Sequence, residues 1–133
     1  MNYSLDASAM VAYLNGEAGA SVVARLLADP SNRCSAHVMN LCEVYYGTLR
    51  ATNEQVAQAA LATLYADGVV MRRDMGQRFW QQVGRLKARG HISLPDCFCI
   101  VLAQELGGEA VTSDHREFDP LVPLGIVPIL FIR

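Results

Sequence analysis

Short apolar runs of strand type alternate with longer segments of helical periodicity, and this alternation constrains the fold more than any other feature. Strands are predicted at residues 2–6, 33–36, 69–71, 109–113 and 128–132. Helices are predicted at about residues 7–14, 17–28, 38–50, 53–66, 75–89 and 95–106, with at most one helical turn at 115–118. Strands that alternate with helices pair in parallel and are covered on both faces, so we expect an α/β protein with a central, mainly parallel sheet.

The length of 133 residues is that of one ordinary domain, and the 52% of apolar residues is enough for a substantial core. No repeat, low-complexity tract or linker divides the chain, so residues 1–133 are expected to form a single domain. The N-terminus has no basic signal-peptide region, and the apolar stretch at residues 121–132 is too short and interrupted to span a membrane.

The cysteines show neither a disulfide framework nor the paired spacing of a zinc site; they are Cys34, Cys42, Cys97 and Cys99. Three of them lie within apolar helical patterns and are expected to be small core residues, namely Cys42, Cys97 and Cys99. Reduced thiols are typical of a cytoplasmic protein, and we expect that location.

Charge is unevenly distributed along the chain. Residues 72–89 carry six basic side chains and one acid, whereas the sequence as a whole has a net charge of −2. A basic segment in an otherwise acidic protein suits a phosphate-bearing ligand held near an acidic cleft. The alternative is an ordinary solvated helix face.

Four acidic residues lie where their predicted elements would turn them toward one end of the sheet: Asp6, Glu43, Asp96 and Asp114. Asp6 and Asp114 follow strands, where the ligand sites of open parallel sheets lie, while Glu43 lies in a helix and Asp96 begins one. If the four converge, charges about 4 Å apart repel by about 4 kcal/mol at an effective dielectric constant of about 20. A hard divalent cation removes that repulsion, and carboxylates are the ligands that Mg²⁺ and Mn²⁺ prefer. The pattern therefore indicates a metal-dependent hydrolase.

Each of these acids also has a simpler explanation. Asp6 precedes a helix and suits an N-cap, and Glu43 lies outside the apolar stripe of its helix, as a solvated glutamate would. Asp96 fits the capping box Ser93-x-x-Asp96, and Asp114 is placed to begin a turn. A capping role is compatible with a metal-facing carboxylate.

Further polar residues lie near these acids. Ser8 could cap a helix, contact a phosphate or donate to a metal ligand, and Asn40 shares a helix face with Glu43. Arg50, two turns beyond Glu43, is a candidate counter-charge or phosphate contact. Asp119 is either an additional ligand or a turn residue before a proline.

Taken together and in order, these motifs resemble the PIN domain, and the resemblance extends over essentially the whole chain. The segments that carry it are Leu5–Ala9, Leu41–Gly47, Ser93–Phe98 and Val111–Phe118. A lone domain of this length is most similar to the VapC-type toxins of toxin–antitoxin pairs. Pro95 and Cys97 depart from the small residues often found around the third acid, but every principal acid is present.

The resemblance implies a three-layer α/β/α sandwich, Mg²⁺- or Mn²⁺-dependent endoribonuclease activity, a homodimer, and inhibition by a small VapB-type antitoxin. It assigns metal-binding and catalytic roles to Asp6, Glu43, Asp96 and Asp114, with polar helpers at Ser8, Asn40 and Thr112. Asp96 or Glu43 would accept the proton of the attacking water, and Arg50 and the basic segment would position the RNA. The alternative is a PIN-like module that binds RNA or protein without cutting.

Overall fold

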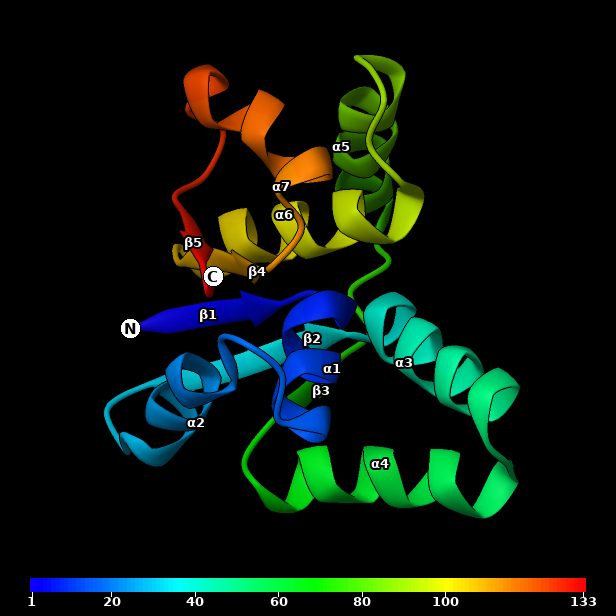
Figure 1. Ribbon diagram of the computed structural model, residues 1–133. Coiled ribbons are helices and arrows are strands. Elements are labelled where there is room, and N and C mark those ends of the chain that lie inside the picture. Colours follow the sequence, from blue (N-terminus) through cyan, green and yellow to red (C-terminus); the bar gives the residue numbers. More distant parts are fainter.

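The computed structural model describes residues 1–133 and contains one five-stranded sheet (Figure 1). The strands are β1 (Asn2–Leu5), β2 (Arg33–His37), β3 (Val70–Arg72), β4 (Glu109–Thr112) and β5 (Ile129–Phe131). Their order is β3-β2-β1-β4-β5, and every neighbouring pair is parallel. The predicted parallel sheet is therefore confirmed.

Helices cover both faces of the sheet, as predicted for a three-layer sandwich. They are α1 (Ala7–Asn15), α2 (Ala20–Ala28), α3 (Val38–Ala51), α4 (Glu54–Ala66), α5 (Gln77–Ala88), α6 (Leu94–Leu106) and α7 (His115–Phe118). A 3₁₀ helix, η1 (Asp119–Leu124), follows α7. Figure 1 shows α1 to α4 on one side of the sheet and α5 to α7 on the other. No helix combines the length and the hydrophobicity that a membrane span needs.

The apolar core forms two layers, one on each side of the sheet. One layer joins α1 to α4 through residues such as Met10, Val44 and Leu64. The other joins α5 to α7 through residues such as Phe98 and Phe118. Burial in both layers fixes the helices against the sheet, because apolar area removed from water stabilises by about 25 cal/mol per Å².

The central position of β1 places the start of the chain beside β4, which is formed late in the sequence. Leu5 pairs with Val111 in the register of β1 and β4, and the Asp6 N–H donates to the Val111 carbonyl at 3.0 Å. The carboxyl ends of β1 and β4 therefore lie side by side, and the residues that follow each strand face the same edge of the sheet.

Several predicted details differ in the structure. The second helix begins at Ala20 rather than Glu17, because Gly19 has a left-handed φ of 93° and lies against Ile132, where a Cβ would meet the backbone at 2.7 Å. The 3₁₀ helix η1 was not expected from the sequence. Cys42 is exposed and not a core residue, because the buried face of α3 carries Leu41 and Val44 instead.

Candidate active site

Asp6 is held from three directions at the junction of β1 and α1. It is 1% exposed, and its Oδ1 accepts the Ala9 N–H at 2.8 Å, which confirms the predicted N-cap. The Ser8 hydroxyl donates to Oδ1 at 2.8 Å, and the Thr112 hydroxyl donates to Oδ2 at 2.5 Å. The carboxylate thus has a fixed orientation, set by its own helix and by the end of β4.

Asp114 is placed by the same threonine and begins α7. Its N–H donates to Thr112 Oγ1 at 2.9 Å, and its Oδ1 accepts the Glu117 N–H at 3.1 Å. Asp114 is therefore a helix N-cap, close to the turn-starting role that the sequence indicated.

Asp96 lies in the first turn of α6, where the predicted capping box is only half formed. The Asp96 N–H donates to the hydroxyl of the N-cap Ser93 at 3.4 Å. The reciprocal bond is made by another helix, because the Ser93 N–H donates to Glu117 Oε2 at 2.9 Å. This exchange of partners leaves the Asp96 carboxylate free to face Asp114 and Glu117 instead of capping its own helix.

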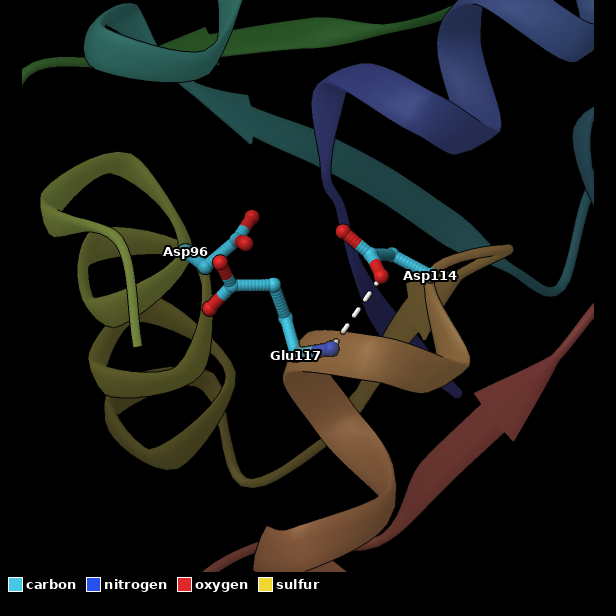
Figure 2. Close-up of side chains that lie close together, drawn as sticks. All are labelled: Asp96, Asp114 and Glu117. Atoms are coloured by element: carbon cyan, nitrogen blue, oxygen red, sulfur yellow. Dashed lines mark hydrogen bonds between the residues drawn. The ribbon is translucent and has the colours of Figure 1, made fainter. Parts of the chain in front are cut away.

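Three of these carboxylates form a compact group, which we call the acidic cluster: Asp96, Asp114 and Glu117. One oxygen from each lies within 4.8 Å of the others. Figure 2 shows Asp96 reaching from α6 toward Glu117 and Asp114, which both come from α7 and its N-cap. Such spacing suits oxygen ligands around one small cation.

Glu43 approaches from α3 and lies outside this compact group. It is half-buried, and burial together with the negative charges of Asp6, Asp114 and Glu117 raises its pKa. The structure therefore brings the four acids named from the sequence near one another at one end of the sheet, and Glu117 is a fifth carboxylate beside them.

The buried acids have an unfavourable electrostatic environment. Burial is the largest cause that raises the pKa of Asp6 to about 6, against the lowering effect of the hydrogen bonds from Thr112, Ala9 and Ser8. Burial, followed by the charge of Asp6, raises the pKa of Asp96 to about 8. No ion pair of the structure includes any of these carboxylates, so none of them is neutralised by a basic side chain in direct contact.

The donor set fits a hard divalent cation. All of the side chains in the acidic cluster are carboxylates, with no thiol or imidazole among them, which favours Mg²⁺ or Mn²⁺ over softer metals. On α3, one turn before Glu43, the Asn40 side chain is completely buried and neither of its amide atoms has a partner within the protein. Buried amides are nearly always hydrogen-bonded, so this one fits a site that a bound group completes.

Two other residues named from the sequence lie outside the acidic cluster. Asp119 Oδ1 is 2.9 Å from His115 Nδ1, and both side chains are exposed. The Arg50 guanidinium carbon lies 5.2 Å from the centre of the Tyr46 ring. In these positions Asp119 pairs with a histidine and Arg50 stacks on an aromatic ring.

Glu117 is the site residue that sequence reasoning did not single out. The signal was present as Asp114-x-x-Glu117, which has capping-box spacing directly after a strand. In the structure this glutamate caps α6 instead of α7 and so connects the two helices that carry the cluster.

Comparisons with known proteins agree with this arrangement. The family model described as "PIN domain" matches residues 3–121. Among curated protein sequences, none matches this chain closely enough to count as a relative.

Solved structures with the same fold include toxin–antitoxin proteins. VapBC2 of Rickettsia felis, bound to a promoter DNA fragment, has a TM-score of 0.74 at 16% identity, with 97% of each chain covered. VapC20 of Mycobacterium tuberculosis, described as a sarcin–ricin loop cleaving toxin, has a TM-score of 0.71 at 18% identity, with 89% of this chain and 94% of that chain covered. A toxin–antitoxin complex from Klebsiella pneumoniae has a TM-score of 0.69 at 20% identity, with 98% of each chain covered. With the family model spanning nearly all of its length and these folds superposing on it, the chain belongs to the PIN domain family.

Proposed function

We propose that this protein is a divalent-metal-dependent endoribonuclease of the VapC type. The observation that carries the proposal is the convergence of five carboxylates from four parts of the chain at the carboxyl end of the sheet, none of them in an ion pair. Family membership and the likeness to VapC20, described as a toxin that cleaves the sarcin–ricin loop, support the same class of reaction.

Asp96, Asp114 and Glu117 would hold the metal, with Asp6 and Glu43 beside them. When bound, Mg²⁺ or Mn²⁺ would lower the pKa of a water molecule and neutralise charge that develops on the phosphate during hydrolysis. The acids in turn become less costly to ionise, because the cation offsets their mutual repulsion.

The side chains of this protein would divide the remaining work. Ser8 and Thr112 keep Asp6 in one orientation through the hydrogen bonds at 2.8 and 2.5 Å. Glu43 or Asp96 would accept the proton of the attacking water. Glu43 suits this role, because it lies near the cluster but is not one of the three carboxylates that would hold the metal.

The biological setting follows from the same family. We propose a small VapB-type antitoxin as the partner, since several structures with this fold are VapBC complexes. A homodimer, an RNA substrate and a cytoplasmic location belong to the same proposal.

The direct test is cleavage of a structured RNA by the purified protein in Mn²⁺ and in EDTA. We expect the wild-type protein to cleave the RNA in Mn²⁺ but not in EDTA. The Asp6→Asn and Asp96→Asn proteins should not cleave it in either. Metal-independent cleavage, or full activity in both variants, would reject the scheme. RNA binding without any cleavage under all metal conditions would instead identify a catalytically silent binding module.

A further inference from the structure

Three adjoining hollows lie along α5, and the last of them has Glu117 of the acidic cluster in its wall; together we call them the α5 groove. Its end hollow has a volume of about 390 Å³ and includes Glu117 in its wall. This hollow shares Leu86 and Arg89 with a second hollow of about 230 Å³. The second hollow shares Gln82 and Gln104 with a third of similar volume, which begins at Arg78. The shared wall residues place the three hollows in a row from the start of α5 to Glu117.

Positive charge follows this path. Arg78, Arg85 and Arg89 are exposed and fall on one face of α5, because positions seven and eleven residues apart recur after whole turns. Arg116 of α7 adds a further guanidinium in the wall of the end hollow. None of these arginines takes part in an ion pair, and Glu105 and Glu117 are the acids in the walls of the groove.

Other basic residues of the same sequence segment are used differently. The Arg72 guanidinium binds the Asp74 carboxylate at 2.9 Å, and Lys87 donates to the Ile92 carbonyl at 2.7 Å. Arg78, Arg85 and Arg89 are the members of the basic segment that line the groove, whereas Arg73 is exposed and unpaired but lies outside it.

The end hollow also has an apolar lining. Leu86, Ile92, Leu121 and Leu124 contribute to it, and Leu86 and Ile92 are almost completely buried. Its volume lies in the range of small-molecule pockets, roughly 300–1,000 Å³. A flat apolar ring with a phosphate attached matches this surface, because the ring contacts leucine side chains or stacks on a guanidinium plane while the phosphate meets an arginine.

We propose that the α5 groove binds the single-stranded RNA segment on one side of the cleaved phosphate, with one base in the end hollow and backbone phosphates along the arginines of α5. This inference rests on the proposed nuclease function and names the substrate path to that site. An acidic peptide is a poorer occupant, because its carboxylate side chains offer no flat, base-sized ring to fill the apolar end hollow.

The test measures the affinity of a fluorescein-labelled, single-stranded oligoribonucleotide of mixed sequence by anisotropy. The protein carries Asp96→Asn, so that the RNA stays intact, and the groove variant adds Arg85→Ala with Arg89→Ala. A matched control adds Arg25→Ala with Arg33→Ala, which removes two exposed and unpaired arginines from α2 and β2. A third variant, Leu124→Trp, fills the hollow from an exposed position without changing the charge.

We expect the groove variant to bind about tenfold more weakly than the control, and its salt dependence to fall by roughly 1.4 log units per log unit of salt, as two lost single-strand phosphate contacts imply. Leu124→Trp should weaken binding at an unchanged salt slope. Melting temperatures verify that the variants remain folded.

Equal affinity and equal salt slope in the groove and control variants would overturn the proposal. Arginine-dependent binding of polyglutamate without arginine-dependent binding of RNA would also overturn it and identify a protein-binding groove. The nuclease proposal fails separately: wild-type protein that never cleaves RNA in Mn²⁺ refutes catalysis, while arginine-dependent RNA binding would still support the groove.

Discussion

The acidic cluster and the α5 groove hold their charges in opposite ways. The cluster gathers carboxylates from α6 and α7, with Asp6 and Glu43 beside them, and burial raises the pKa of Asp96 to about 8. The arginines of the groove come mainly from one helix and remain exposed to water. Charge in the cluster therefore costs folding free energy, whereas charge in the groove costs little because it stays solvated.

This difference indicates how substitutions should separate function from stability. Neutralising a buried, like-charged acid removes repulsion, so the protein should become more stable while it loses metal binding. Neutralising a solvated arginine should change RNA affinity and leave the melting temperature almost unchanged. The predictions below test that division.

Asp96→Asn should have the largest effect. It removes a metal-facing oxygen charge, and we expect at least about a hundredfold loss of RNA cleavage in Mn²⁺. The melting temperature of the metal-free protein should rise by several degrees, because the amide needs no neutralising partner in its buried position. Initial cleavage rates and thermal unfolding in EDTA measure the two effects. A lower melting temperature would mean that the carboxylate stabilises the fold and that the cluster is not under electrostatic strain.

The fold and part of the site were predictable because they depend on local patterns. The strand-type runs, helix starts and turns of this sequence identify the alternation, and the alternation alone favours a parallel sheet. Asp6 and Asp114 follow strands, and ligand sites in such sheets lie beyond strand ends, so their proximity could be expected before the structure. The order β3-β2-β1-β4-β5 and the contact of Leu5 with Val111 depend on tertiary pairing, which no local pattern specifies.

The hydrogen-bond partner of Glu117 could not be predicted from the sequence. Its spacing from Asp114 is that of a capping box, which predicts a bond within α7. The structure instead uses it to bind Ser93 of α6 at 2.9 Å. A partner exchange between helices leaves no periodic signal in the sequence, because it depends on how α6 and α7 pack.

Glu117→Gln should have an intermediate effect. The amide oxygen can still accept the Ser93 N–H, so the cap of α6 remains, but one negative charge of the cluster is lost. We expect about a tenfold loss of cleavage with a small change in melting temperature. Glu117→Ala is the matched variant, and the additional loss of the cap should destabilise it by about 1 kcal/mol. Equal stability of the two variants in urea unfolding would argue against the capping role.

The stability of the metal-free protein should fall with rising pH between about pH 4 and pH 8. The pKa of Asp96 is about 8 in the folded protein and near its usual value of 3.8 when unfolded, so the folded state holds the extra proton between these values. The stability contributed by this proton is fully present below about pH 4, is lost progressively as the pH rises, and is gone above about pH 8. The melting temperature in EDTA should therefore fall by several degrees from pH 5 to pH 8 and level off at higher pH.

Asp96→Asn is the control for this pH dependence, because it lacks the titrating group. Its melting temperature should change less than that of the wild type over the same range, and Mn²⁺ should stabilise the wild type most at the alkaline end. Parallel pH profiles for the two proteins would show that Asp96 titrates normally and is not held in a repulsive site.

Asp119→Asn should have the smallest effect. Asp119 is exposed and pairs with His115, and its oxygens are not part of the acidic cluster, although its position in the sequence made it a candidate ligand. Exposed pairs contribute little to stability, so we expect cleavage within about twofold of wild type and a melting temperature within about 2 °C. Since Asp96→Asn makes the same chemical change in the cluster, the two variants differ only in where the carboxylate lies. A loss of cleavage as large as that of Asp96→Asn would place Asp119 on the metal. An exposed carboxylate would then contribute to the metal site as much as a buried one.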